Sequence, residues 1–263
     1  YYHTGGAKSF NLITSIKNEG ESPIEIFLSK GISGPDPDSI FAGHVATQKF
    51  MKYITNDCGE IIKIKGMSQF DIASQEVSSK KGVATGIIRV WLLSGLKAIL
   101  EVKAVGSEGS PLTRLSNLKE DGRVSGIFDT STINIYKEYY AGRGPIDIRL
   151  GEEPVLANKK EFDLFLGNYG MLHRINIKLI NNTPNTMERV SLHYVSQGGP
   201  TRGTFVINGR LYGTGLLDSN LRRSERLLAL DLPPSTTKEL KILMMPQPGS
   251  HYPTRLLLIG KTL

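Results

Sequence analysis

Cysteine is almost absent from this sequence, and long apolar runs are missing altogether. Cys58 is the single cysteine among 263 residues. No disulfide can form within the chain, which excludes a small disulfide-stapled domain, although a core of this size can fold and be exported without bridges. No apolar run reaches the roughly 18 residues that a membrane-spanning helix needs. We therefore expect no membrane span.

Sequence signatures of catalysis are also missing. There is no Gly-x-Ser-x-Gly elbow, so a serine hydrolase of that type has no nucleophile. Gly260-Lys261-Thr262 resembles the end of a phosphate-binding loop, but Arg255 stands where the first glycine belongs. We predict a protein that is not an enzyme, with no catalytic residue and no cofactor.

Metal-binding spacings are equally scarce. The five histidines do not have the close spacing of a zinc motif, although a hairpin could bring His173 and His193 together. Asp36 and Asp38 could offer oxygen ligands to calcium, but the twelve-residue calcium loop is missing and helix capping is the preferred interpretation. We predict no metal site.

Positive charge is in excess but not concentrated. The net charge is +7 and the isoelectric point is near 9.3, which favours anionic partners such as cell-wall polymers. The basic residues nevertheless occur in scattered pairs mixed with acids, which indicates an ordinary charged surface. We predict no nucleic-acid partner.

The sequence contains an internal repeat of alternating segments. Residues 167–200 contain two runs of alternating apolar and polar residues, separated by an asparagine-rich turn and closed by Gly198-Gly199-Pro200. Residues 8–35 follow the same plan, with a turn at 18–23 and a closing Gly34-Pro35. Alternation of this kind is typical of half-buried strands, so we interpret both stretches as β-hairpins that open two related domains.

Many short strands with frequent turns predict an all-β protein. We expect two tandem antiparallel β-sandwiches of the immunoglobulin-like or jelly-roll-like kind. The predicted boundaries are residues 1–150 for the first, 151–160 for a linker and 161–263 for the second. One helix is expected at 39–54, capped by Asp38 or Ser39, and Asn208-Gly209 predicts a tight hairpin.

Aromatic side chains could form a flat platform for sugar rings or a surface for self-association. Packing in the core is the alternative, because strands favour aromatics in any case. Platform candidates are Trp91, Tyr139, Tyr140, Tyr169 and Tyr252. Our predicted partner contacts are Tyr1, Tyr2, Tyr139, Tyr140 and Tyr252.

Five short motifs occur in order along the chain: Tyr2-His3-Thr4-Gly5-Gly6, Gly31-Ile32-Ser33-Gly34-Pro35-Asp36, Ala42-Gly43-His44-Val45, Ser125-Gly126-Ile127-Phe128-Asp129 and Gly167-Asn168-Tyr169-Gly170-Met171-Leu172. Together they resemble a region of secreted proteins of Gram-positive spore-forming bacteria, which are named for an accompanying "copper amine oxidase-like" stalk domain. The resemblance implies an exported cell-surface or matrix protein without an established reaction. The stalk domain, a topaquinone site and a three-histidine copper site are not recognisable in this sequence.

Two functional hypotheses follow. The first is a noncatalytic extracellular structural module, a cell-surface, matrix or self-assembling fibre subunit that forms a homo-oligomer or polymer through its chain ends or sheet edges. The second is a module that binds carbohydrate or an anionic cell-wall polymer. The start at Tyr1-Tyr2 fits removal of a secretion signal and equally a trimmed chain; the expected location is secreted or on the cell surface.

Overall fold

Strands dominate the described part of the protein, which contains a single helix. The computed structural model confirms the predicted all-β class. It divides into two compact units, Tyr1–Arg123 (unit 1) and Val124–Leu263 (unit 2), and each is described by itself. The described part of the chain contains no helix with the length and apolar character needed to cross a bilayer. The structure describes residues 2–3, 9–77, 82–106, 130–152, 167–220 and 222–263.

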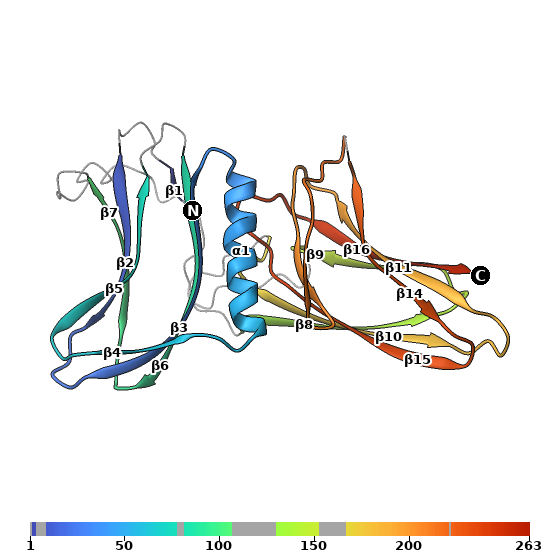
Figure 1. Ribbon diagram of the computed structural model, residues 1–263, viewed down its shortest axis with the longest axis horizontal. Coiled ribbons are helices and arrows are strands. Elements are labelled where there is room, and N and C mark those ends of the chain that lie inside the picture. The colour runs from blue at the N-terminus through green and yellow to red at the C-terminus, as the bar shows by residue number, and fades with distance from the viewer. Residues whose placement is uncertain (1, 4–8, 78–81, 107–129, 153–166, 221) are drawn as a thin grey trace. The chain divides into compact units, whose positions relative to one another are not determined.

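Unit 1 is a pair of sheets packed around an aliphatic core (Figure 1). Sheet A has the strand order β1-β6-β3-β4 and sheet B the order β5-β2-β7. Ile16 of sheet B packs against Ile24, Ile26 and Leu28 of sheet A. The elements are β1 (Tyr2–His3), β2 (Phe10–Asn18), β3 (Ile24–Asp36), α1 (Ser39–Thr55), β4 (Glu60–Ile64), β5 (Ser68–Val77), β6 (Val83–Ser94) and β7 (Ile99–Gly106).

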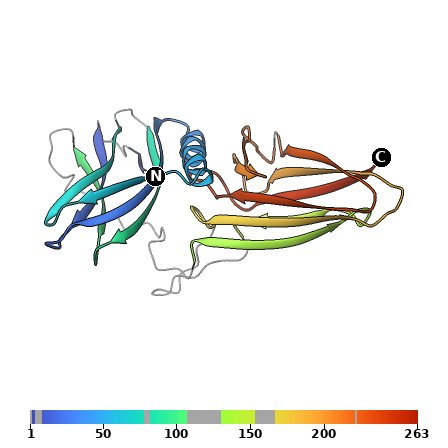
Figure 2. The ribbon, with the colours of Figure 1, turned by 60° about the horizontal axis from the view of Figure 1, so that its bottom comes forward.

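Unit 2 also has two sheets, which Figure 2 shows as two layers. Sheet C has the order β13-β12-β15-β10-β8 and sheet D the order β14-β11-β16-β9. Their facing side chains form a larger core, which includes Tyr194 and Phe205 with rings 5.0 Å apart. The elements are β8 (Thr132–Tyr140), β9 (Ile146–Leu150), β10 (Leu172–Asn181), β11 (Glu188–Ser196), β12 (Thr204–Ile207), β13 (Arg210–Gly213), β14 (Ser224–Leu232), β15 (Thr236–Met244) and β16 (Thr254–Thr262).

The two predicted hairpins are wrong, because each pair of strands lies in two different sheets. Strand β2 belongs to sheet B and β3 to sheet A; in the same way β10 belongs to sheet C and β11 to sheet D. The turn after β2 and the turn after β10 therefore cross from one layer to the other. Alternation of apolar and polar residues shows that a segment is half-buried, but it does not show which strand pairs with it.

A buried asparagine holds each of these crossings together. The Nδ2 of Asn18 donates to the carbonyls of Ser22 and Lys65, at 2.9 and 3.0 Å, and its Oδ1 accepts from the N–H of Gly20. At the second crossing, Asn181 Nδ2 donates to the carbonyls of Thr186 and Leu232, at 2.8 and 3.0 Å. Its Oδ1 accepts from the N–H of Thr183. Both side chains satisfy backbone groups that the crossing takes out of the sheets, and the bond from Asn181 to the Leu232 carbonyl is buried.

The two units share further strand neighbours. The pairs β2–β5, β3–β4 and β3–β6 of unit 1 correspond to β10–β15, β11–β14 and β11–β16 of unit 2. Likewise β1 pairs with β6 as β9 pairs with β16. The last position differs: β7 lies antiparallel beside β2, whereas β8 lies parallel beside β10. Parallel pairing of β8 with β10 is an exception to the predicted antiparallel sheets.

The predicted domain boundary at residue 150 is wrong, because unit 2 already begins at Val124. Strands β8 and β9, assigned to the first domain, pair with β10 and β16 of unit 2. Their partners are distant along the chain, so local composition did not reveal the pairing. The predicted linker falls outside the described residues from residue 153 onward.

Two local predictions are confirmed. Helix α1 begins after Asp38, whose carboxylate accepts from the N–H of Phe41 at 2.9 Å, which makes this residue a cap. Asn208 and Gly209 connect β12 to β13 with φ values of 47° and 81°, the left-handed conformation that a tight hairpin requires.

Candidate binding surfaces of unit 1

Helix α1 lies against β3 and β6 on the outer face of sheet A. The helix approaches β3 so closely at Gly31 that a Cβ there would lie 2.1 Å from the carbonyl oxygen of Ala46. Only glycine permits this contact. Figure 1 shows the helix lying along β3. The same sheet face also carries the exposed aromatic group described next.

That exposed group spans three neighbouring strands. Phe27 of β3 stands directly opposite Ile61 of β4 and Trp91 of β6, and residues paired in this way project from the same face. The rings of Phe27 and Trp91 stack with centroids 5.9 Å apart and planes inclined by 26°. Trp91 is 55% exposed and Ile61 69%. We call Phe27, Ile61, Arg89 and Trp91 the Trp91 face.

Positive charge lies against these rings. The Arg89 guanidinium lies 5.3 Å from the centre of the Trp91 ring and 5.5 Å from that of Phe50, a buried residue of α1. Such a cation over a ring holds both in place. Beside them, Lys63 and Glu25 form an exposed ion pair of 3.7 Å. The Trp91 face therefore combines a flat apolar surface with a fixed cation and polar neighbours.

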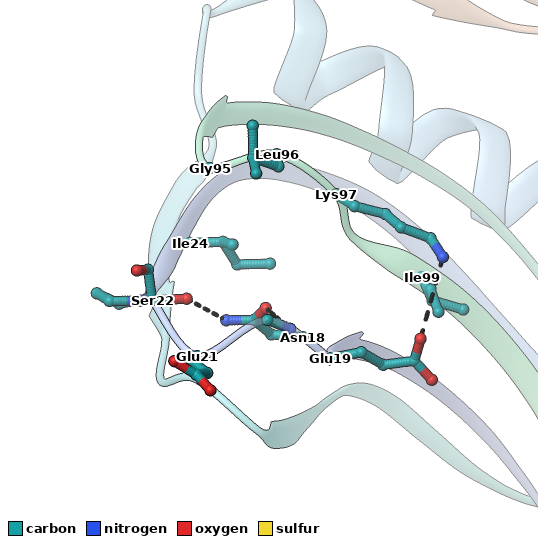
Figure 3. Close-up of a pocket in the computed structure, with 11 residues that line it drawn as sticks. Asn18, Glu19, Glu21, Ser22, Ile24, Gly95, Leu96, Lys97 and Ile99 are labelled. Carbon is teal, nitrogen blue, oxygen red and sulfur yellow. Dashed lines mark hydrogen bonds and ion pairs between the residues drawn. The ribbon is translucent and has the colours of Figure 1, made fainter.

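A separate hollow of about 370 Å³ lies at the end of unit 1, between the turn after β2 and the turn from β6 to β7 (Figure 3). Ile24, Leu96 and Ile99 contribute apolar lining, and Glu19 and Lys97 stand at the rim, 4.0 Å apart. Glu19 also accepts from Lys17 at 2.8 Å.

Glu19 at the rim of this hollow is paired with two lysines, Lys17 and Lys97. The hydrogen bond from Lys17 lowers the pKa of Glu19, and the same bond raises the pKa of Lys17. A carboxylate held in its ionised form by a neighbouring cation accepts hydrogen bonds and does not supply protons near neutral pH. Glu19 is therefore not suited to act as a general acid near neutral pH.

Tyr139, a predicted partner contact, is instead a core residue of unit 2. It is 1% exposed, and its hydroxyl donates to the buried carboxylate of Glu188. Glu188 also accepts from the N–H of Gly142 at 2.8 Å. Burial, and then the bond to Glu188, raise the pKa of Tyr139. The prediction is wrong because alternation could not show that this ring faces inward.

Of the other predicted partner contacts, two form hydrogen bonds within unit 2, and the side chains of the remaining two are not among the described residues. Tyr140 donates its hydroxyl to Glu138 at 2.6 Å, with Arg143 over its ring. The hydroxyl of Tyr252 accepts from the N–H of Gln247 at 3.1 Å, and burial raises the pKa of this tyrosine well above its usual value. The remaining two are Tyr1, which lies outside the described residues, and Tyr2, whose backbone forms β1 while its side chain is not described.

The candidate metal ligands do not converge. Because β10 and β11 lie in different sheets, the histidine pair proposed from a hairpin does not form: His173 is buried, and His193 hydrogen-bonds to Ser191 at the partly exposed surface. Burial lowers the pKa of His173 to about 4. Within the described ranges, no three histidine, cysteine or acidic side chains come together in a way that could hold a metal ion.

Comparison with known proteins assigns no family. No family model and no curated protein matches the chain. Among solved structures, an anti-sigma factor domain-containing protein from Clostridium clariflavum aligns at 9% identity over 97% of this chain and 80% of its own, with a TM-score of 0.22. The insecticidal delta-endotoxin Cry8Ea1 from Bacillus thuringiensis aligns at 12% identity over 93% and 54%, with a TM-score of 0.23.

A third solved structure is the N-terminal CBM22-1-CBM22-2 tandem domain of Xyn10C from Paenibacillus barcinonensis, at 10% identity over 97% of this chain and 71% of its own, with a TM-score of 0.15. TM-scores this low do not establish a common fold, so none of the three similarities assigns a function. None of the three is described as copper amine oxidase-like, and that resemblance stays a prediction.

Of the surface features, the sequence indicated Trp91 but not its neighbours. Trp91 was among the candidate platform residues, whereas Phe27, Ile61 and Arg89 were not singled out. The missing information is strand register: Phe27 and Ile61 are far from Trp91 along the chain and come beside it only through the pairing of β3 with β4 and β6. Arg89 lies on the same strand as Trp91, two residues away. The alternation of Arg89 with Trp91 was the one local signal that both project from the same face.

Proposed function

We propose that this chain is a noncatalytic extracellular structural module that holds a polysaccharide of a cell wall or matrix against the Trp91 face. The observation that carries the proposal is the stacked, exposed pair of Phe27 and Trp91 on an open sheet face. Aromatic rings present an electron-rich face to which the C–H groups of a sugar ring pack well. The sheet supplies a flat support for a long chain of such rings.

The charge beside the rings favours an anionic polymer. Arg89 lies over the rings of Trp91 and Phe50, so it places positive charge beside the exposed aromatic pair. The net charge of +7 acts in the same direction over longer distances. We therefore expect acidic wall polymers to bind more tightly than neutral glucans at low salt, and the difference to shrink as salt screens it.

Retention on insoluble polymers tests the proposal. The whole chain is incubated with purified cell wall, chitin and cellulose at low and high salt, and the bound fraction is measured. Trp91→Ala should lower the affinity for the retained polymer by at least about tenfold, which equals about 1.4 kcal/mol.

Tyr136→Ala is the matched control, because Tyr136 is a 72% exposed aromatic residue on β8 of unit 2. This variant should bind like the unmodified chain. Absence of retention on every polymer at low salt, or equal retention of Trp91→Ala and the unmodified chain, would overturn the proposal.

A further inference from the structure

The outward side chains of sheet A form rows that cross the strands. Residues that stand directly opposite each other on neighbouring antiparallel strands project from the same face, and the strands lie about 4.8 Å apart. Ile61 of β4, Phe27 of β3 and Trp91 of β6 form one such row, which we call the apolar row. It is therefore about 10 Å long and runs perpendicular to the strands.

The next row, toward the start of β3, is polar. Lys63 of β4 and Ser94 of β6 stand on either side of Glu25 of β3. Lys63 and Glu25 form the ion pair of 3.7 Å, and their side chains keep 67% and 41% of their surface open to solvent. This polar row places charges and hydrogen-bonding groups along the whole length of the apolar row.

The row on the opposite side is closed by helix α1 and the loop that follows it. Ser29 of β3 stands opposite Arg89 of β6. Ser29 is buried, and its hydroxyl donates to the carbonyl of Cys58 at 3.1 Å. Arg89 lies over the ring of Phe50 of α1. The surface that this part of sheet A offers to a ligand is therefore the apolar row with the polar row beside it.

Gly59 keeps the ring of Phe27 in the apolar row. A Cβ at Gly59 would lie 2.2 Å from Cζ of this ring. Gly59 is not among the glycines with positive φ, so the contact with the ring, and not the backbone, requires glycine here. Phe27 thus lies between Gly59 and Trp91, whose ring plane is inclined to its own by 26°. A side chain at position 59 should turn the Phe27 ring out of the row without unfolding the sheet.

We infer that the apolar row binds a straight, acidic polysaccharide chain that crosses the strands of sheet A. The sugar rings pack their C–H faces on Ile61, Phe27 and Trp91. Their carboxylates lie along the polar row, where Lys63 supplies positive charge and each bound carboxylate competes with Glu25 for the same ammonium group. The inference rests on the proposed function and adds to it the shape of the polymer and the direction in which it lies.

Two sets of glucuronate oligomers test the inference, because they differ only in linkage: β-1,4 links keep the chain straight, whereas α-1,4 links bend it into a coil. Oligomers of about two to six residues are titrated into the whole chain at low salt, and calorimetry gives the dissociation constants. The longest β-linked oligomer should bind at least about tenfold more tightly than its α-linked counterpart. Its affinity should rise with length up to about three residues and then stay level, because the row is about 10 Å long.

Variants along the row add a readout that a loss of stability would not produce. Ile61→Ala shortens the row at β4, so it should weaken the binding of the longest β-linked oligomer and leave that of the shortest unchanged. Ile259→Ala is the matched control, because Ile259 is an exposed isoleucine on β16 of unit 2. Gly59→Ala should weaken the binding of every length at an unchanged melting temperature. Its control is Gly86→Ala, whose Cβ would meet nothing closer than 3.5 Å.

The polar row is tested by the sign of two charge changes. Lys63→Gln removes the cation and should weaken the binding of β-linked glucuronate by about two- to fivefold, the range expected for exposed charge pairs. Glu25→Gln removes the competing carboxylate and should strengthen it by a similar factor. Both effects should disappear at high salt, which screens exposed charges.

The outcomes separate this inference from the proposed function. Loss of retention on cell wall by Trp91→Ala, together with equal binding of the two linkages or binding of neither, would leave the proposed function standing and overturn the inference. A uniform effect of Ile61→Ala on all lengths, or effects of Lys63→Gln and Glu25→Gln with the same sign, would also overturn it. Absence of retention on every polymer would overturn the proposed function itself.

Discussion

The buried asparagines at the two sheet crossings should contribute strongly to the stability of the fold. In Asn181→Asp, the side chain keeps its shape but can no longer donate from Nδ2 to the carbonyls of Thr186 and Leu232. Two acceptors lose their donor, and a carboxylate is placed against two carbonyl oxygens. Leaving a buried polar group unsatisfied costs about 1–3 kcal/mol. We expect the free energy of unfolding to fall by about 2–5 kcal/mol at pH 7.

The loss should depend on pH with a definite sign. The carbonyl oxygens and the burial disfavour the charged form, so the pKa of the new carboxyl is raised in the folded state above its unfolded value of about 3.9. The deficit relative to the unmodified chain is therefore smallest below about pH 4 and grows as the pH rises toward 7. Urea unfolding followed by far-UV circular dichroism, at about pH 4 and at pH 7, measures this deficit in the free energy of unfolding.

Asn182→Asp is the matched control, because Asn182 is the exposed neighbour in the same turn. The unit affected can also be identified: Trp91 is the only tryptophan and lies in unit 1. Asn18→Asp should shift the unfolding transition seen by tryptophan fluorescence, whereas Asn181→Asp should leave it in place. If Asn181→Asp and Asn182→Asp are equally stable, the assigned role of the asparagine is refuted.

Three further predictions concern stability. Because burial lowers the pKa of His173 to about 4, this residue stays neutral in the fold; acidification from pH 6.5 to 4 should destabilise unit 2 by about 3 kcal/mol, and His173→Gln should remove that part of the pH dependence in urea titrations. Gly31→Ala should cost about 1–3 kcal/mol in thermal unfolding by overpacking against α1, whereas Gly86→Ala, whose Cβ would meet nothing closer than 3.5 Å, should cost less than half as much. Tyr139→Phe leaves the buried Glu188 without its hydroxyl donor and should cost about 1–3 kcal/mol at pH 7; an unchanged midpoint in denaturant would contradict the role of that contact.

Much of the fold could be predicted from the sequence because it depends on local chemistry. The cap at Asp38 and the left-handed turn at Asn208-Gly209 are determined by a few neighbouring residues, and both were found correctly. Alternation located most strands. It could not identify partners, because period-two patterns look the same in a hairpin and in two strands of facing sheets.

The errors in the predicted fold arise because local sequence patterns do not identify strand partners. The segment from β8 to β9 was assigned to the first domain, although its partners β10 and β16 come later along the chain. The same limit applies to the surface: Tyr139 and Trp91 are both aromatic residues on alternating strands, yet one is buried against Glu188 and the other exposed beside Phe27. Only the register and the packing of the sheets separate these two cases.

The fluorescence of Trp91 tests the proposed binding surface most directly, because no other tryptophan contributes to the signal. Titration of the whole chain with soluble fragments of an acidic wall polysaccharide should quench the emission and shift it to shorter wavelength as a sugar ring displaces water from the indole. The change should saturate and should weaken with added salt. An emission spectrum that stays constant, while the same polymer binds to the chain by another measure, would contradict binding at the Trp91 face.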